Sequence, residues 1–267
     1  MTASAKGTAL VTGASSGIGA IYADRLARRG YDLILVARSR ERLDGLAKRL
    51  RDETGRAVEA VAADLNDKVD LARVEAILRT NAGITMLVNN AGVGATGLLL
   101  SSDVDKMDDM IALNVTALSR LTHAAAPGFA ARGGAIINMA SIVGVAPEIL
   151  NGVYGGTKAF VLALSLSLHK ELADKNVRIQ AVLPGATATD FWETAGLPVE
   201  HLPGEIVMRA DEMVDAALAG FDQGELITIP SLPDAAEWQA YEAARQKLIP
   251  NLSRSVPATR YRARVAA

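Results

Sequence analysis

The stretch Thr8-Ala9-Leu10-Val11-Thr12-Gly13-Ala14-Ser15-Ser16-Gly17-Ile18-Gly19 decides the fold, because it links an apolar run to a glycine-rich turn and then to an amphipathic segment. The run predicts a buried strand, and the segment after the turn predicts a helix. Free N–H groups and the positive dipole end at the start of a helix bind anions, and glycines let the backbone approach a pyrophosphate closely. Three residues separate the first two glycines, so the generic GxGxxG spacing is not matched, and a turn without function is the alternative.

The same order of strand, turn and helix recurs along the chain. Apolar runs predict strands at about residues 8–12, 32–37, 57–62, 85–88, 134–139, 177–183 and 225–229. Amphipathic stretches between them predict helices at about residues 17–29, 40–54, 67–80, 104–131, 152–174 and 211–221. Strands that alternate with helices form right-handed crossovers and a parallel sheet that is covered on both faces. We therefore predict the α/β class, with one doubly wound domain built on a seven-stranded parallel sheet.

The domain organisation follows from where this pattern stops. No linker interrupts it before residue 184, which predicts one domain over residues 1–230. Residues 184–210 are rich in Pro, Gly and large apolar side chains, and long irregular loops in compact domains are usually lids or binding loops. The C-terminal extension, residues 231–267, carries six basic and three acidic side chains, a local charge of +3. It is interpreted as a solvated terminus, with a cap over the site or a subunit contact as the alternative.

The composition excludes several classes of function. With a net charge of −2 and a pI of about 6.0 over 267 residues, the chain has no basic field of the kind that binds nucleic acid. The absence of cysteine excludes disulfides, thiol nucleophiles and thiolate zinc sites, and three scattered histidines lack ligand spacing, so no metal site is predicted. No apolar stretch approaches the roughly 18 residues of a membrane span. We expect a soluble cytoplasmic protein with no membrane partner.

Tyr154 and Lys158 form the candidate catalytic pair. They stand four residues apart, and in a helix this spacing places both side chains on one face. The ordinary pKa of Tyr is about 10, so acid and base chemistry at neutral pH requires this pKa to fall by roughly three units, to which a neighbouring ammonium contributes. Ser141 lies thirteen residues upstream of Tyr154, at the end of an apolar run. The alternative is a helical Tyr beside a surface Lys, because this spacing is common.

The end of the second predicted strand indicates the preferred nucleotide. NAD selectivity usually requires an acidic residue there for the ribose 2′-hydroxyl, whereas an Arg accommodates the 2′-phosphate of NADP. Ala37 is followed by Arg38, and then by Arg40 and Arg42. We therefore predict NADP as the cofactor, with NAD as the alternative. Arg40 and Arg42 can equally belong to a solvated helix start.

Taken together, these features resemble the short-chain dehydrogenase/reductase family over about residues 7–229. The resemblance is carried by the segment from Thr12 to Gly19, Asp64, Asn89-Asn90-Ala91-Gly92, Asn114, Ser141, Tyr154 with Lys158, and Pro184-Gly185. It implies a single Rossmann-like domain that binds NAD(P), with the substrate over the C-terminal ends of the strands. It also implies an enzyme that acts on CH–OH and C=O groups.

The resemblance assigns roles to four catalytic residues. A hydride passes between the nicotinamide and the carbonyl carbon, while Tyr154 donates or accepts the proton of the oxygen. Ser141 would stabilise the charge that develops on this oxygen. Lys158 would bind the nicotinamide ribose and lower the Tyr154 pKa, and Asn114 would hold a water that links Lys158 to solvent. Alternatively, Ser141 only ends a strand, and Asn114 is a polar residue in a long helix. Because Asn is a poor helix former, it requires a compensation such as a local kink with a water.

The resemblance also implies a set of cofactor contacts. Asp64 and Leu65 would touch the adenine, with a helix N-cap near Asp67 as the alternative role of Asp64. Asn90 would line the cofactor beside the fourth strand, and Thr187 would meet the nicotinamide carboxamide. Many NADP-preferring relatives carry a basic residue at the position of Ser16, which this chain does not. The implied contacts are Gly13, Ala14, Ser15, Ser16, Gly17, Ile18, Gly19, Arg38, Asp64, Leu65, Asn90, Ala91, Gly92, Tyr154, Lys158, Pro184, Gly185 and Thr187.

The loop after Pro184 indicates the substrate class. It offers Phe191, Trp192, Leu197 and Leu202, and no Arg or Lys occurs in residues 186–208. A carboxylate or phosphate on the substrate would therefore find no partner there. We predict a largely apolar ketone or alcohol; the alternative is that these side chains only pack the loop onto the domain.

Two further expectations concern function and assembly. The runner-up function is an NADP-sensing binding or regulatory protein with little turnover. The predicted helices at residues 104–131 and 152–174 correspond to those that pair across dimers and tetramers in the resembling family. A homodimer or homotetramer is therefore expected by analogy.

Overall fold

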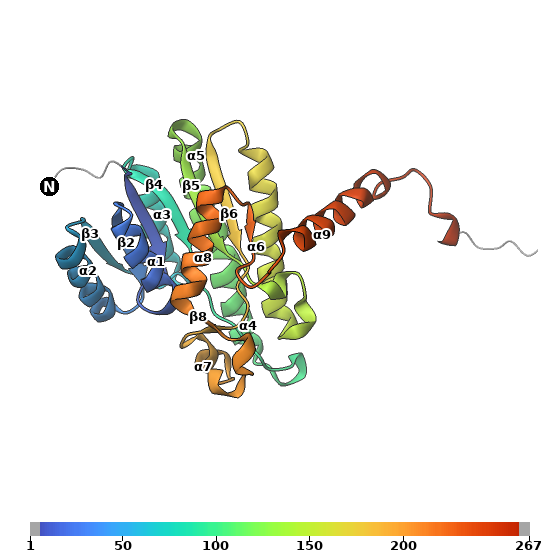
Figure 1. The fold of residues 1–267 in the computed structure, drawn as a ribbon, viewed down its shortest axis with the longest axis horizontal. Helices are drawn as coiled ribbons and strands as arrows, with labels where there is room; N and C mark the ends of the chain where they lie inside the picture. Colours follow the sequence, from blue (N-terminus) through green and yellow to red (C-terminus); the bar gives the residue numbers. More distant parts are fainter. Residues whose placement is uncertain (1–5, 262–267) are drawn as a thin grey trace, which may run out of the picture. The chain divides into compact units, whose positions relative to one another are not determined.

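The computed structural model describes residues 6–261 and shows a parallel sheet between two layers of helices (Figure 1). The strand order is β3-β2-β1-β4-β5-β6-β9, and each neighbouring pair is parallel. The bounds are β1 Thr8–Thr12, β2 Asp32–Ala37, β3 Val58–Ala62, β4 Ile84–Asn89, β5 Gly134–Met139, β6 Val177–Val182 and β9 Ile227–Thr228. The prediction of a doubly wound, Rossmann-like domain with a seven-stranded sheet is confirmed.

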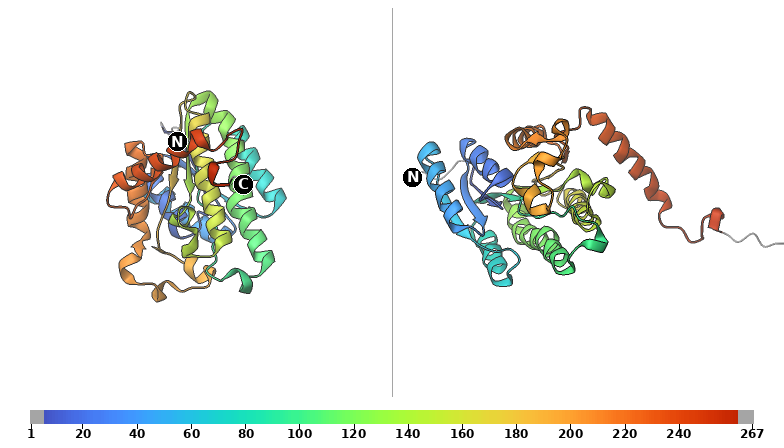
Figure 2. Two further views of the ribbon diagram at one scale, coloured as in Figure 1. Left: turned by 90° about the vertical axis from the view of Figure 1, so that its right-hand side faces the viewer. Right: turned by 90° about the horizontal axis from the view of Figure 1, so that it is seen from below.

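Successive side chains of each strand enter two different cores, because they point to opposite faces of the sheet. Ala9 and Val11 of β1 join a core with the helices at residues 17–28, 40–54 and 210–223, whereas Leu10 joins a core with those at residues 68–80, 118–132 and 152–171. The layers can be followed in the views of Figure 2. The helices are α1 Gly17–Arg28, α2 Arg40–Thr54, α3 Lys68–Thr80, α4 Val104–Ile111, α5 Leu118–Arg132, α6 Gly152–Glu171, α7 Phe191–Ala195, α8 Ala210–Gln223 and α9 Ala235–Leu248.

Two predicted segments differ from the structure. The single helix expected over residues 104–131 is α4, a six-residue π-helical turn at Ala112–Ala117, and α5. The irregular loop at residues 184–210 contains α7 and a parallel pair of two-residue strands, β7 Thr187–Ala188 and β8 Met208–Arg209. Strands of two residues are too short to show an alternation of apolar and polar side chains in the sequence.

The winding of the chain places the site at one edge of the sheet. β1 has β2 on one side and β4 on the other, so the strand order reverses at β1. In open α/β sheets, ligands bind at the carboxyl ends of the strands at this reversal. The glycine turn after β1 and the segment Asn90 to Gly92 after β4 therefore meet there.

The chain divides into two units, Met1–Ser231 and Leu232–Ala267. The first contains the whole seven-stranded sheet. In the second, the described residues form α9 and two short 3₁₀ turns, and α9 has no buried side chain.

Candidate active site

The glycine turn is held against the start of the segment after β4. The Thr12 hydroxyl accepts hydrogen bonds from the backbone N–H groups of Asn90 and Ala91, both at 3.0 Å. The Asn90 side chain in turn donates to the Thr12 carbonyl at 2.9 Å. A Cβ on Gly19 would lie 2.3 Å from the Gly13 carbonyl oxygen and 2.6 Å from Asn90 Nδ2. The turn therefore has no room for a side chain at this position.

The start of α1 has the donors that an anion requires. Gly13 and Gly17 adopt φ values of +66° and +52°, which favour glycine. Ser16 occupies the N-cap but makes no side-chain capping bond, and the first turn holds no acidic residue. The Ala14 N–H donates to the Val36 carbonyl at 3.2 Å, but no side chain caps the first N–H groups of α1. These groups can therefore bind a pyrophosphate, as the sequence of the turn predicts.

The nucleotide-selecting positions lie at the neighbouring strand ends. Arg38 is exposed after β2, and its guanidinium makes no ion pair or hydrogen bond with another side chain of residues 6–261. Arg40 donates instead to the Ala60 carbonyl at 3.1 Å. After β3, Asp64 accepts a hydrogen bond from Asn66 N, whereas Asp67 caps α3, so the N-cap alternative for Asp64 is wrong. Leu65 is buried beside it.

Asn114 lies within the π-helical turn and is buried. Its side chain accepts from Val93 N at 3.0 Å and donates to Val93 O at 2.8 Å. It also donates to Thr157 Oγ1 at 3.1 Å, and Thr157 in turn donates to the Tyr154 carbonyl. The expected distortion of the helix is therefore present, and its compensation is a set of hydrogen bonds between three segments. Thr157 was not singled out from the sequence, because a Thr inside a helix carries no signal of its own.

Ser141, Tyr154 and Lys158 are brought together as expected, and all three are buried. Asn151 caps α6 by accepting from Val153 N and Tyr154 N, which fixes the start of the helix that carries the pair. Lys158 Nζ lies 5.8 Å from the centroid of the Tyr154 ring and donates to the Met139 carbonyl at 2.8 Å. A phenol, a hydroxyl and an ammonium thus converge at the carboxyl end of β5, an arrangement that can transfer a proton to or from a carbonyl oxygen.

Burial sets the protonation of this cluster. It raises the pKa of Tyr154 to about 12, and the Ser141 hydroxyl opposes this shift. It lowers the pKa of Lys158 to about 8. Desolvation disfavours the charged form of either group, which explains both signs. The pKa of Tyr154 thus lies above its ordinary value of 10.0, not below it as the resemblance implies, and the phenol is protonated at neutral pH.

The segment after β6 lies against the residues that follow β5. The Pro184 carbonyl accepts from Ile142 N at 3.1 Å and from Ser141 Oγ at 3.4 Å. The Thr187 hydroxyl donates to the Gly185 carbonyl at 3.1 Å. These bonds join the segment to the end of β5. Pro184 therefore lies beside the serine of the proton-transfer cluster.

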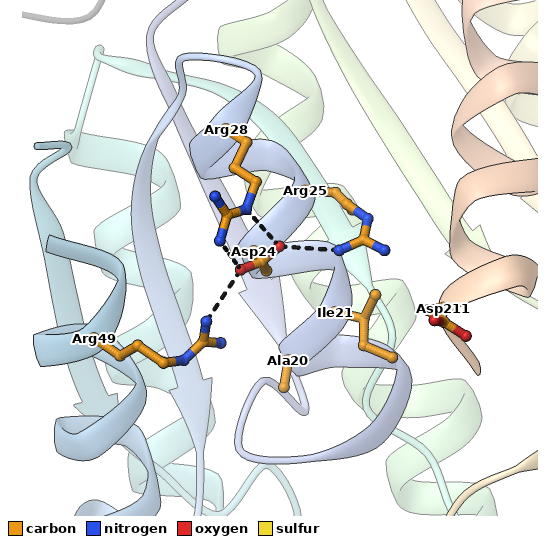
Figure 3. A pocket seen from close by; sticks show the side chains of 7 residues that line it. All are labelled: Ala20, Ile21, Asp24, Arg25, Arg28, Arg49 and Asp211. Atoms are coloured by element: carbon orange, nitrogen blue, oxygen red, sulfur yellow. Dashed lines mark hydrogen bonds and ion pairs between the residues drawn. The ribbon is translucent and has the colours of Figure 1, made fainter. Parts of the chain in front are cut away.

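A cavity of about 510 Å³ lies elsewhere in the described chain, against α1, and Figure 3 shows its lining. The buried Asp24 carboxylate accepts there from Arg25, Arg28 and Arg49 at 3.0 to 3.2 Å. Arg25 also pairs with Asp215 of α8, and both Arg28 and Arg49 pair with Glu53 of α2. Every guanidinium thus has a carboxylate partner. We interpret the cluster as a clamp that holds α1 to α2 and α8.

The sequence of this chain matches a known protein family over most of its length. The family profile described as short chain dehydrogenase matches residues 7–198. The chain belongs to the short-chain dehydrogenase family. The resemblance identified from the sequence motifs is therefore confirmed, and with it the assignment as an oxidoreductase.

Solved structures of this short-chain dehydrogenase family superpose closely on the chain. A short-chain dehydrogenase from Sphingobium yanoikuyae in complex with NADPH is 53% identical with a TM-score of 0.93, over 96% of this chain and 100% of that one. A bulky-bulky ketone specific alcohol dehydrogenase from Comamonas testosteroni is 47% identical with a TM-score of 0.88, over 96% and 98% of the two chains.

A curated relative matches a smaller part of this chain than these structures do. The very-long-chain 3-oxoacyl-CoA reductase of Anas platyrhynchos is 36% identical over 208 residues, which are 76% of this chain and 66% of the reductase. In residues 6–261, no helix is both long enough and apolar enough to cross a bilayer.

Proposed function

We propose that this protein transfers a hydride between NADP(H) and a carbonyl/alcohol couple on a bulky, apolar substrate, with Tyr154 as the acid and base. The observation that carries the proposal is the convergence of Tyr154, Ser141 and Lys158 at the same sheet edge as the uncapped start of α1. NADP is supported by the NADPH complex of the Sphingobium structure and by Arg38 after β2.

The nucleotide would lie along this edge. The turn from Gly13 to Gly19 would hold the pyrophosphate, and Arg38 would hold the 2′-phosphate. Asp64 with Leu65 would meet the adenine. When bound, NADPH supplies the hydride from its nicotinamide.

The segments nearest the proton-transfer cluster would receive the nicotinamide half. They comprise Asn90, Ala91, Gly92, Pro184, Gly185 and Thr187. A Cβ on Gly92 would lie 3.0 Å from Asn114 Oδ1 and 3.5 Å from Lys158 Nζ. Glycine at this position therefore keeps a side chain out of the space beside the Lys158 ammonium.

The protonation of Tyr154 fits the direction of reduction. Its pKa of about 12 keeps the phenol protonated, so it can donate a proton to the carbonyl oxygen while Ser141 stabilises the developing charge. Oxidation of an alcohol requires the phenolate instead. The Lys158 ammonium would favour that form electrostatically, against the effect of burial. We therefore expect the rate of oxidation, and not that of reduction, to rise with pH.

Asn114 is proposed to support Lys158 through a bound water. Its side chain is held by the Val93 backbone and Thr157, which fixes the amide within the turn that faces Gly92. A fixed amide can orient a water without reorganising during the reaction. A water so placed would carry protons between Lys158 and solvent.

The substrate class follows from the lining of the site. Val143 and Phe191 pack around Tyr154, and residues 186–208 contain no Arg or Lys. The Comamonas relative is specific for bulky ketones, and it is 47% identical to this chain. A screen of NADPH oxidation over ketones of increasing size tests the proposal. Turnover of acidic or sugar substrates alone would contradict it.

The Tyr154→Phe variant tests the role of the phenol directly. We expect kcat to fall by about 10²- to 10⁴-fold, because the proton donor is lost, while NADPH binds with unchanged affinity. Tyr241→Phe, at a side chain 46% exposed on α9, is the matched control and should keep full activity. NADPH binding without measurable turnover in the parent would instead favour a sensing role.

We also propose that the protein assembles as a homodimer or homotetramer through α5 and α6. Phe160 lies on α6 with 39% of its surface exposed, and helix faces of this kind pair across subunits in the family. Size-exclusion chromatography with light scattering measures the assembly. A strictly monomeric enzyme would contradict this proposal.

A further inference from the structure

Phe191, the first residue of α7, packs beside the proton donor. Its ring centroid lies 5.8 Å from that of Tyr154, with the planes tilted by 45°. The ring of Trp192 meets it edge-on at 5.6 Å and 88°. Phe191 is half-buried and belongs to the small apolar cluster that includes Val143 and Tyr154. Its ring thus fills space next to the group that would protonate the substrate.

The tip of this ring rests on the backbone of Gly94. A Cβ on Gly94 would lie 2.2 Å from Phe191 Cζ and 2.8 Å from Cε2, closer than real contacts allow. Gly94 is not among the glycines with positive φ, so its backbone conformation alone does not require glycine. The absence of a side chain at this position is therefore explained by the place that the Phe191 ring occupies.

Hydrogen bonds hold α7 in this place at both ends. Trp192 Nε1 donates to the Thr187 carbonyl at 2.9 Å. The Thr96 backbone N–H and hydroxyl both donate to the Ala195 carbonyl, at 3.1 and 2.9 Å. The segment that follows Gly94 is thus bonded to the helix that carries Phe191. These bonds therefore fix the position of the Phe191 ring against Gly94.

We propose that Phe191, seated on Gly94, is a specificity-determining residue whose ring limits the size of the substrate group beside Tyr154. The inference rests on the proposed function and deepens it. A carbonyl oxygen that receives a proton from Tyr154 must lie within hydrogen-bond distance of the phenol. One substituent of that carbonyl then lies against the volume that Phe191 fills. The Phe191 side chain sets how large this substituent can be.

The test uses Phe191→Ala, Gly94→Ala and the double variant, with ketones that differ stepwise in the size of one substituent. Phe191→Ala should raise the ratio of kcat/KM for the largest over the smallest ketone at least ~10-fold, because a pocket that gains volume admits larger groups. Gly94→Ala should displace the ring and lower kcat/KM for all ketones. Adding Phe191→Ala to it should restore activity. Val69→Ala, 77% exposed on α3, is the control and should leave the ratio unchanged.

The outcomes separate this inference from the proposed function. A parent with turnover and a folded Phe191→Ala variant with an unchanged ratio would overturn the role of Phe191. If Phe191→Ala does not fold, Phe191→Leu carries the same test with a smaller increase expected. A parent without turnover of any ketone would refute the proposed function. Calorimetric binding of the ketone series to the complex with NADP⁺ then measures the same size ratio, and equal ratios in parent and variant would overturn the inference.

Discussion

The nucleotide side and the substrate side of the site differ in how much room they leave for an added side chain. The nucleotide side, residues 12–19 with 89–92, is closed by hydrogen bonds between Thr12 and Asn90, and a methyl group at Gly19 would strike the backbone. On the substrate side, residues 186–209, Gly204 has nothing within 4 Å of an added Cβ, and Ile206 is 56% exposed. Because the cofactor always has the same shape, the turn that would bind it can be packed so closely that it accepts no larger side chain. Substrate choice can then vary in the part of this segment that follows α7, where Gly204 and Ile206 have few contacts.

The largest effect is expected from a substitution at Gly19. Gly19→Val should weaken NADPH binding at least ~100-fold, about 3 kcal/mol, because the new side chain must displace the Gly13 carbonyl or the Asn90 amide. NADPH fluorescence titration measures the affinity, and circular dichroism confirms that the sheet is retained.

Gly204→Ala is the matched control on the substrate side. Its added methyl meets no atom within 4 Å, so the affinity for NADPH should change by less than about 2-fold. Equal losses of NADPH affinity in Gly19→Val and Gly204→Ala would show that the two sides do not differ in the room they leave for a side chain.

A smaller effect should follow from loosening the clamp on α1. Asp24→Asn should lower the free energy of unfolding by about 2 kcal/mol, since it removes the buried partner of three guanidinium groups, two of them half-exposed. Burial raises the pKa of Asp24, but hydrogen bonds from Arg28, Arg25 and Arg49 outweigh it, so the pKa lies below its ordinary value. Urea denaturation at several pH values measures the difference between parent and variant.

The sign of the pH dependence follows from this lowered pKa. A carboxyl with a folded-state pKa below its unfolded value of about 3.9 stabilises the fold fully above about pH 5. The stabilisation is lost as the pH falls below about 4, toward the folded-state pKa. The difference in the free energy of unfolding between the parent and Asp24→Asn should therefore decrease in acid. Asp52→Asn, which breaks the exposed pair with Lys48, should cost less than about 0.5 kcal/mol at every pH.

The fold could be predicted from the sequence because its strands and helices are long enough to show a period. Three sequence features predicted residues that the structure has at the carboxyl end of the sheet. They are the glycine turn, the strand at residues 134–139 and the spacing of Tyr154 and Lys158. The break at Asn114 was expected from its poor helix propensity, but not the hydrogen bonds to Val93 that compensate it. Those partners are 21 residues apart, and no local pattern reports such a contact.

The substrate side was harder to predict for a physical reason. β7 and β8 have two residues each, and α7 has five, so neither periodicity nor length could reveal them. The contact of Phe191 with Gly94 joins α7 to the loop after β4, and it depends on tertiary packing alone. Likewise, the high pKa of Tyr154 comes from burial, which a spacing of four residues does not encode.

The smallest effect is expected at Arg38, on the exposed rim of the nucleotide side. Arg38→Ala should lower kcat/KM for NADPH about tenfold, about 1.4 kcal/mol, because an exposed charge-assisted bond to the 2′-phosphate is lost. The value for NADH should change by less than about 2-fold, since NADH lacks that phosphate. Arg56→Ala is the control: Arg56 lies before the amino end of β3, whereas Arg38 follows the carboxyl end of the parallel strand β2, so the loss of Arg56 should leave both values unchanged. An equal loss for NADH and NADPH at Arg38 would show that the residue supports the fold of this rim and does not read the 2′-phosphate.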